Sequence, residues 1–148
     1  MATILVDTNI LVYAYDRNEF EKQGQAIETL NRLQITGSGR LSTQCLAEFF
    51  NAVTRGPAPM LSVEDAAQQV EWLARAWPVF DVTPPIVLEG IRGVREHQFN
   101  FWDAQVWATA RLNQIPVVFS EDFNTGTLIE GVRFVNPFTE NFQVERGV

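Results

Sequence analysis

The sequence predicts an α/β protein built around a parallel sheet, and three observations support this fold class. Short apolar runs alternate along the chain with longer stretches of helical periodicity. The run Val117 to Phe119 is apolar throughout, which is typical of a strand in a sheet covered on both faces. Four acids stand where parallel strands end or the next helices begin, the places at which such a sheet gathers ligands: Asp7, Glu48, Asp103 and Asp122.

Length and composition predict one domain, residues 1–148, because a chain of this size suits a single core. The start of the chain has no basic leader and reaches an acid at Asp7, which predicts neither a signal peptide nor a membrane span. With Cys45 as its one cysteine, the protein is expected in a reducing cytoplasm.

The first strand is predicted at Thr3 to Val6, a short and β-rich apolar run. The tripeptide Asp7-Thr8-Asn9 then offers capping oxygens to a short helix. A longer helix is predicted from Lys22 to Gln34, because its apolar residues recur three or four positions apart. The segment Gly37-Ser38-Gly39 ends this helix.

A second strand is predicted at Arg40 to Ser42, and the helix that carries Glu48 follows it. The segment 56–59, Gly-Pro-Ala-Pro, breaks that helix. Ser62 and Asp65 then form a capping box for a helix from Val63 to Ala76, so both residues are assigned a structural role.

The second half of the chain continues the alternation. Pro84-Pro85 fits the first turn of a helix, where the amide hydrogen that proline lacks would have no partner in the helix. The predicted elements are a strand at Val79 to Val82, helices at Ile86 to about His97 and at Phe101 to Asn113, a strand at Val117 to Phe119 and a last edge strand at Arg133 to Val135. The final ten or so residues are predicted to form a loose tail.

Three of the four acids also suit a role without chemistry. Asp7 is a good helix N-cap, Asp103 fits the first turn of a helix, and Asp122 fits a turn. Glu48 lies beside the apolar stripe of its helix, where an unpaired carboxylate is costly. Because all four are expected at one edge of the sheet, we predict a site for a hard divalent cation, which prefers oxygen ligands.

Composition excludes several other kinds of site. Cys45 is the one cysteine, so no disulfide forms within the chain, and with His97 as the one histidine no zinc cluster is expected. The pattern around Cys45 predicts a buried thiol, and His97 is predicted to sit at a helix end, where its imidazole suits the dipole. The net charge of −7 argues against a protein that coats phosphates, although a bound metal can supply positive charge to a nuclease.

Four motifs, in order, resemble one known family. They are Val6-Asp7-Thr8-Asn9-Ile10-Leu11, Ala47-Glu48, Phe101-Trp102-Asp103-Ala104 and Phe119-Ser120-Glu121-Asp122, followed by Gly-Val-Arg-Phe-Val-Asn-Pro-Phe at 131–138. Together they resemble the PIN-domain ribonucleases, and most closely the VapC-type toxins of bacterial toxin–antitoxin pairs. The resemblance covers essentially the whole chain, and the four blocks in order are far more specific than Asp-Thr-Asn alone.

The resemblance implies a three-layer α/β/α sandwich with a central parallel sheet. It also implies an endoribonuclease that hydrolyses RNA with Mg²⁺ or Mn²⁺, a small antitoxin as a partner, and a homodimer. The catalytic and metal-binding quartet that it implies is Asp7, Glu48, Asp103 and Asp122. The polar residues in supporting roles are Thr8, Asn9 and Ser120.

The resemblance also separates two adjacent acids. It favours Asp122 as the site residue, and Glu121 is then expected to be solvated or paired with an arginine. Several arginines are candidates to guide an RNA backbone at the rim, although each also suits a solvated position: Arg17, Arg40, Arg55 and Arg95. Trp72, Trp77 and the helix between them are interpreted as core, with a dimer or antitoxin surface as the alternative.

Rival functions differ in the residues that they require. A haloacid-dehalogenase-type phosphatase has a second aspartate two residues after the first, where this chain has Asn9. A response-regulator receiver needs a lysine after a late strand, and the one lysine is Lys22. A non-enzymatic module that binds a cation or a partner remains an alternative, as does a PIN nuclease that processes RNA outside a toxin–antitoxin pair.

Overall fold

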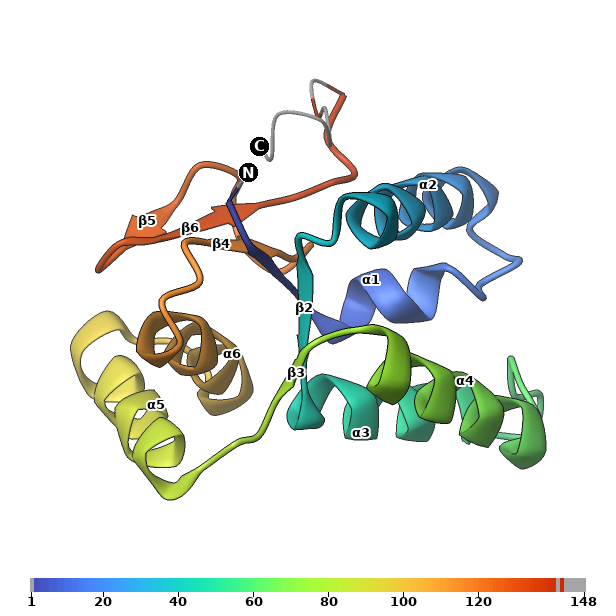
Figure 1. Ribbon diagram of the computed structural model, residues 1–148, viewed down its shortest axis with the longest axis horizontal. Coiled ribbons are helices and arrows are strands. Elements are labelled where there is room, and N and C mark those ends of the chain that lie inside the picture. Colours follow the sequence, from blue (N-terminus) through green and yellow to red (C-terminus); the bar gives the residue numbers. More distant parts are fainter. Residues whose placement is uncertain (1, 141, 143–148) are drawn as a thin grey trace.

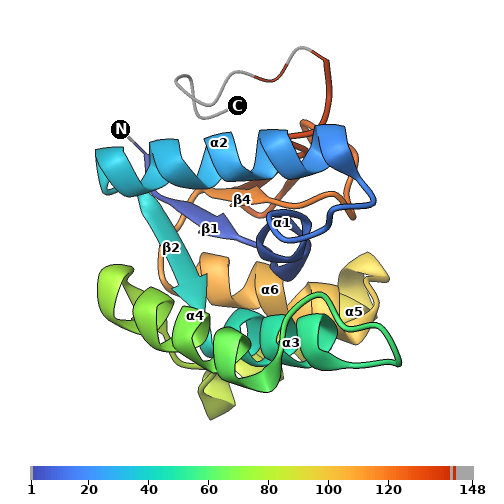
Figure 2. The same ribbon diagram turned by 90° about the vertical axis from the view of Figure 1, so that its right-hand side faces the viewer.

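The computed structural model describes residues 2–140 and 142 of the chain. The strands in these residues are β1 (Ile4–Val6), β2 (Gly39–Ser42), β3 (Val79–Phe80), β4 (Val117–Phe119), β5 (Leu128–Ile129) and β6 (Val132–Val135). The helices are α1 (Thr8–Tyr13), α2 (Phe20–Thr36), α3 (Thr43–Thr54), α4 (Val63–Ala76), α5 (Pro84–His97) and α6 (Phe101–Leu112). The strands form one sheet in the order β3-β2-β1-β4-β6-β5, with helices on both sides (Figures 1 and 2).

Alternating side chains in the central strands fill two separate cores. Ile4 and Val6 of β1 point to the core beneath α1, α2, α3 and α4, whereas Leu5 points to the core beneath α5 and α6. In β4, Val117 and Phe119 face the first core and Val118 faces the second. Both faces of the sheet are therefore buried, which explains the uninterrupted apolar runs of the sequence. The predicted three-layer α/β/α sandwich is confirmed.

The order of the strands places a crevice at the carboxyl ends of β1 and β4. The chain runs outward from β1 to β2 and β3, and then returns to β4 on the other side of β1. The two central strands are parallel, with Val6 opposite Phe119, and the amide of Asp7 extends the ladder by donating to the carbonyl of Phe119 at 2.9 Å. Ligands bind at such a switch point in open α/β sheets.

The predicted edge position of the last strand is wrong. β6 lies between β4 and β5, and the edge of the sheet is β5, which pairs antiparallel with β6. Glu130 and Gly131 connect β5 to β6 with φ angles of 48° and 85°, the left-handed backbone that a two-residue hairpin turn requires. The sequence pattern missed β5 because the strand has two residues and exposes one of them.

Most other element boundaries agree with the predictions, and α4 and β4 match them at both ends. α2 is longer than expected at both ends and ends at Gly37, whose φ of 68° forms the left-handed C-cap. β3 is shorter than expected, because the amide of Val82 leaves the sheet and donates to Thr43 Oγ1. The predicted tail lies outside the described residues except at 139, 140 and 142.

The predictions for Cys45 and Trp77 are confirmed, since both side chains lie in the core. Burial raises the pKa of the Cys45 thiol to about 12, so it is not a nucleophile at neutral pH. The interpretation of Trp72 as a core residue is wrong, because its side chain on α4 is half-exposed. No helix in the described part of the chain combines the length and the apolarity needed to cross a membrane.

Candidate active site

A cleft of about 490 Å³ opens at the carboxyl ends of β1 and β4, and all four predicted acids line it. Three of them converge. Asp7, Asp103 and Asp122 each have a carboxylate oxygen within 4.8 Å of the other two. They come from the end of β1, the first turn of α6 and the loop after β4, so the fold brings three distant segments together at one point.

Asp7 is both a helix cap and a member of this cluster, so the two roles proposed for it from the sequence coexist. Its side chain is 4% exposed. One oxygen, Oδ1, accepts from the amide of Thr8 at 2.8 Å, which caps α1. The other, Oδ2, accepts from the hydroxyl of Ser120 at 2.7 Å. These two bonds fix the orientation of the carboxylate.

Asn9 and Ser120, predicted as supporting residues, hold the third acid of the cluster. The Ser120 hydroxyl accepts from the amide of Asp122 at 3.1 Å while it donates to Asp7. The side-chain amide of Asn9 donates to Asp122 Oδ2 at 3.2 Å, and its oxygen accepts from the amide of Glu121. A single hydroxyl and a single side-chain amide therefore link the segments that follow β1 and β4.

Asp103 is positioned by the cap of its own helix. Its amide donates to Asn100 Oδ1 at 3.0 Å, and Asn100 Nδ2 donates back to its carboxylate at 2.5 Å. α6 is buried on nearly all sides between the sheet and α5, and Asp103 is half-buried because the first turn of the helix opens into the cleft.

Glu48, the fourth predicted acid, lies in the wall of the cleft but outside the group of three. The hydroxyl of Thr8 donates to its Oε1 at 2.7 Å, and Gln44 Nε2 approaches the same oxygen at 3.4 Å. The carboxylate is therefore paired, and Thr8 is the residue that holds it. Gln44 was not predicted, although it stands four positions before Glu48 on the same helix face.

Glu121 points away from the cluster, as expected, but its predicted partner was wrong. It pairs with a lysine: Lys22 Nζ lies 2.5 Å from Glu121 Oε2, and the hydroxyl of Tyr13 donates to Oε1 at 2.7 Å. Lys22 reaches it from α2, which the sequence did not place beside the loop after β4. Asp122 is thus the acid of the adjacent pair that faces the cleft.

Burial and mutual repulsion disfavour the charged forms of the three clustered acids. Burial is the largest cause and raises the pKa of Asp7 from 3.8 to about 7. Burial, and then the charge of Asp122, raise the pKa of Asp103. The pKa of Asp122 is raised by burial and by its neighbour Glu121. A cation bound among these carboxylates would oppose all of these effects.

These shifts predict how the stability of the metal-free protein depends on pH. The Asp7 carboxyl binds a proton more tightly in the folded state, so the stability it contributes is complete below pH 3.8 and is lost as the pH rises through about 7. The total is on the order of 4 kcal/mol. In EDTA, Asp7→Asn should therefore be more stable than the wild type at pH 8 and lose that advantage at pH 4. Urea unfolding of both proteins across this pH range tests the prediction. A difference in their free energies of unfolding that does not change with pH would refute it.

The donor set of the cluster fits a hard divalent cation. It offers carboxylate oxygens from three segments, with the side chains of Asn9 and Ser120 directly behind them and no sulfur or imidazole ligand among the described residues that form it. Mg²⁺ and Mn²⁺ prefer such oxygen ligands and keep several waters. The acidic cluster is therefore compatible with metal binding.

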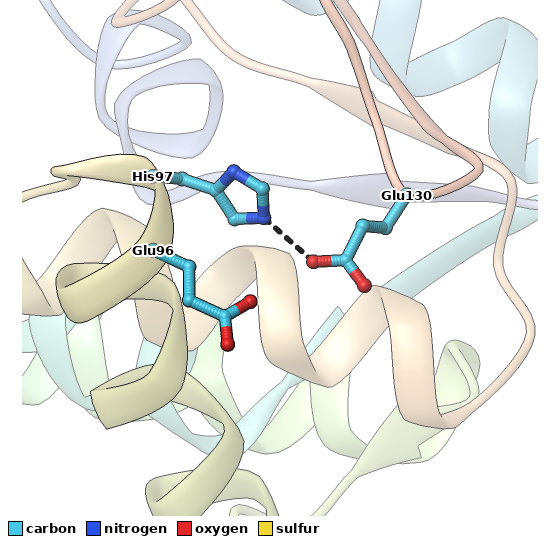
Figure 3. A group of neighbouring side chains, drawn as sticks. All are labelled: Glu96, His97 and Glu130. Atoms are coloured by element: carbon cyan, nitrogen blue, oxygen red, sulfur yellow. Dashed lines mark hydrogen bonds and ion pairs between the residues drawn. The ribbon is translucent and has the colours of Figure 1, made fainter.

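A second group of residues that could ligate a metal, namely Glu96, His97 and Glu130, forms an ion-pair network instead. His97 Nε2 lies 2.6 Å from Glu130 Oε2, so the end of α5 contacts the hairpin turn, and Glu96 lies beside them (Figure 3). Arg92 bridges Glu96 and Glu130, so its guanidinium offsets part of their negative charge. His97 is at a helix end, as predicted, and its bond links that end to β5–β6.

The cleft also contains residues to which the sequence analysis assigned no role at the site. Trp102 and Asn51 line it, as does a fifth acid, Asp16. Of the four arginines considered for guiding RNA, Arg55 alone lines the described part of the cleft. The spacing of residues in the sequence does not identify Trp102 or Asn51 as site residues, because it predicts both as solvent-facing positions on helices.

Comparisons with known proteins agree with this fold. The sequence matches the family model of the PIN domain over residues 4–125. A comparison with curated proteins finds no match. Solved structures with a similar fold include a chain of a FitAB complex bound to a DNA fragment, with a TM-score of 0.69 and 18% identity, covering 93% of this chain and 96% of that chain.

Two further similar structures have named sources. One is a chain of a toxin–antitoxin complex from Klebsiella pneumoniae, with a TM-score of 0.65, 18% identity, and coverage of 92% of this chain and 98% of that chain. The other is a VapC toxin from Mycobacterium tuberculosis, described as cleaving the sarcin-ricin loop, with a TM-score of 0.64, 21% identity, and coverage of 88% and 99%. These likenesses establish the fold. Because the family model spans most of the sequence, the chain belongs to the PIN domain family.

Proposed function

We propose that this protein is an endoribonuclease that uses Mg²⁺ or Mn²⁺ to hydrolyse RNA phosphodiester bonds, and that it is the toxin of a type II toxin–antitoxin pair. The observation that carries the proposal is the convergence of Asp7, Asp103 and Asp122 in one cleft. Membership in the PIN family supports a nuclease, and the similar folds of VapC and FitAB chains support the toxin assignment.

Each acid has a distinct part in the proposed mechanism. Asp7 and Asp103 are the principal ligands, held in place by Ser120 and Asn100. Asp122 completes the set, directly or through a water. When bound, a divalent cation supplies Lewis acidity that makes water more nucleophilic and offsets charge on the scissile phosphate.

Glu48 is suited to orient the attacking water. Its Oε1 accepts hydrogen bonds from Thr8 and Gln44, and its Oε2 is the oxygen proposed to hold a water in the cleft. Asp7, with a pKa of about 7 in the absence of metal, must lose its proton before it ligates. Metal affinity is therefore expected to rise as the pH rises through neutrality.

Metal dependence is the test of the catalytic proposal. Cleavage of a labelled RNA should require added Mg²⁺ or Mn²⁺ and stop in EDTA, because the described lining of the cleft offers no thiol or imidazole that could act in place of a metal-activated water. Asp103→Asn, expressed and purified in parallel, controls for contaminating nuclease. Undiminished cleavage in EDTA, or equal cleavage by the variant, would contradict a metal mechanism at these acids.

The antitoxin is proposed to bind an apolar groove of about 280 Å³ on the α1–α4 side of the sheet. Tyr15, Ile27 and Leu30 line it, together with Trp72 and Trp77. Ile27 and Trp72 are exposed, so a partner that covered them would remove apolar surface from water. The similar fold of a chain from a toxin–antitoxin complex supports such a partner. A homodimer is proposed through the exposed residues Leu88 and Ile91 of α5.

The toxin assignment predicts that expression in the native host arrests growth unless a small partner is co-expressed. Asp103→Asn should be harmless in the same host, because toxicity requires cleavage. Growth curves with and without the adjacent gene measure the effect. Harmless expression of the active enzyme without any partner would favour a nuclease that processes RNA.

A further inference from the structure

The four tryptophans of the chain fall into two groups. Trp77 and Trp107 are buried, and their indole N–H groups donate to Gln34 Oε1 and to the carbonyl of Ile129. Trp72 and Trp102 are 50% and 59% exposed. Of these two, Trp102 borders the cleft that holds the acids. An indole exposed to this extent contributes little to the core, so its position at the cleft calls for another explanation.

The backbone beneath the exposed ring is held firmly. Gln44 Nε2 donates to the carbonyl of Trp102 at 3.2 Å, and Gln105 Nε2 donates to Gln44 Oε1 at 2.8 Å. Both glutamines are buried. The ring itself makes a T-shaped contact with Phe101 at 5.1 Å between centroids. Trp102 is therefore an exposed ring on a fixed support, directly before Asp103 in the sequence.

A second hollow, of about 480 Å³, lies beside the cleft. Trp102 and Asn51 line both hollows, together with Gln44 and Glu48. Asn51 is exposed on α3 and carries an amide that both donates and accepts hydrogen bonds. A flat ligand on Trp102 would thus lie next to an amide and beside the acids.

The charge of the cleft favours a base over a phosphate as the group bound here. Five acids line the cleft, and Arg55 is the one basic residue in its described lining. Affinity for RNA through neutralised phosphates depends on several basic residues, which this surface lacks. Stacking of a base on an aromatic ring needs no charge and tolerates any sequence. A base that is already stacked in a duplex is not available to stack on an aromatic side chain.

We propose that Trp102 is a stacking platform for an unpaired nucleobase of the RNA, and that the hollow shared with Asn51 receives this base. The inference rests on the proposed function and deepens it, because it makes single-stranded or looped RNA the substrate class. Trp102 is a substrate-positioning residue, which places the neighbouring phosphate over Asp7 and Asp103.

Binding without cleavage tests the proposal. In an Asp103→Asn background with Mg²⁺, fluorescence anisotropy measures the affinity of a labelled twelve-nucleotide oligoadenylate and of a matched oligomer of abasic ribose phosphates. Trp102→Ala should weaken oligoadenylate binding by about 5- to 150-fold, the equivalent of about 1–3 kcal/mol per stacked base, and leave the abasic oligomer unaffected. Trp102→Phe should retain most of the affinity. Phe20→Ala, which removes an exposed aromatic ring that lines neither hollow, is the matched control.

Equal binding of the two oligomers, or equal loss of both in Trp102→Ala, would overturn the proposal and assign Trp102 to a protein contact. The failure of the proposed function is separable from this result. If the wild type cleaves RNA but stacking is absent, the nuclease assignment stands alone. If Trp102 selectively binds oligoadenylate but the wild type cleaves no RNA with any divalent metal, the base site stands without the nuclease. Absence of binding by both oligomers to the folded protein would refute the base site.

Discussion

Asp7→Asn and Asp103→Asn are each expected to lower RNA cleavage by at least about 100-fold, because a divalent cation contributes several kcal/mol to transition-state stabilisation. Both side chains belong to the cluster within 4.8 Å. Asparagine keeps the size of aspartate and one acceptor oxygen, so the bonds to Thr8 and to Asn100 can persist and the fold should remain intact. Cleavage rates at saturating Mg²⁺ measure the loss of activity, and calorimetric titration with Mn²⁺ measures the loss of metal affinity.

Glu71→Gln is the matched control for this experiment. It also removes one negative charge, but from an exposed position on α4 where the nearest partner, Arg75, is 3.9 Å away. It should leave both cleavage and Mn²⁺ affinity unchanged. Wild-type turnover by Asp103→Asn would show that the cluster is not the catalytic centre, whereas loss of activity in Glu71→Gln would point to a global effect of charge.

Asp122→Asn is expected to lower the cleavage rate at least about tenfold, and Glu121→Gln to leave it within about twofold, because ligand and near-ligand groups have effects of this order on metal sites. Asp122 faces the cleft and is held by Asn9, whereas Glu121 is paired with Lys22. The partly exposed pair of Glu121 and Lys22 contributes about 0–1 kcal/mol, so the stability cost of Glu121→Gln is also small.

Cleavage measured at several Mg²⁺ concentrations distinguishes a weaker metal site from a slower chemical step in these two variants. Thermal unfolding of both proteins provides the control for stability. If Glu121→Gln proves the more damaging, the Lys22 pair is part of the catalytic machinery and the fourth position of the quartet has been assigned to the wrong neighbour.

The sequence predicts those elements whose ends carry their own chemical signals. α4 is capped by Ser62, whose hydroxyl accepts from the amide of Asp65, and the capping pattern in the sequence identifies both residues. β5 carries no such signal. Its two residues pair only because β6 follows across a tight turn, and Leu128 is 57% exposed, so no apolar alternation marks it. Local sequence patterns do not predict short strands whose formation depends on pairing with a neighbouring strand.

The acids of the site were predictable because strand ends and helix starts are local features that a parallel sheet gathers in space. Their hydrogen-bond partners were not, since the bonds between Thr8 and Glu48 and between Ser120 and Asp7 join residues 40 and 113 positions apart. Lys22 illustrates the same limit. Its helix was predicted, but its contact with Glu121 depends on how α2 packs beside the loop after β4.

The bond between Ser120 and Asp7 joins residues that are 113 positions apart, and it has a consequence for synthesis of the protein. Two of the three clustered acids, Asp103 and Asp122, belong to the last third of the chain, and β1 has no β4 to pair with until that part has been made. Contacts at such separation form late, after long loops have closed. On the proposed function, an unfinished chain on the ribosome would therefore lack the metal centre with which to cleave RNA, including the RNA from which it is being translated.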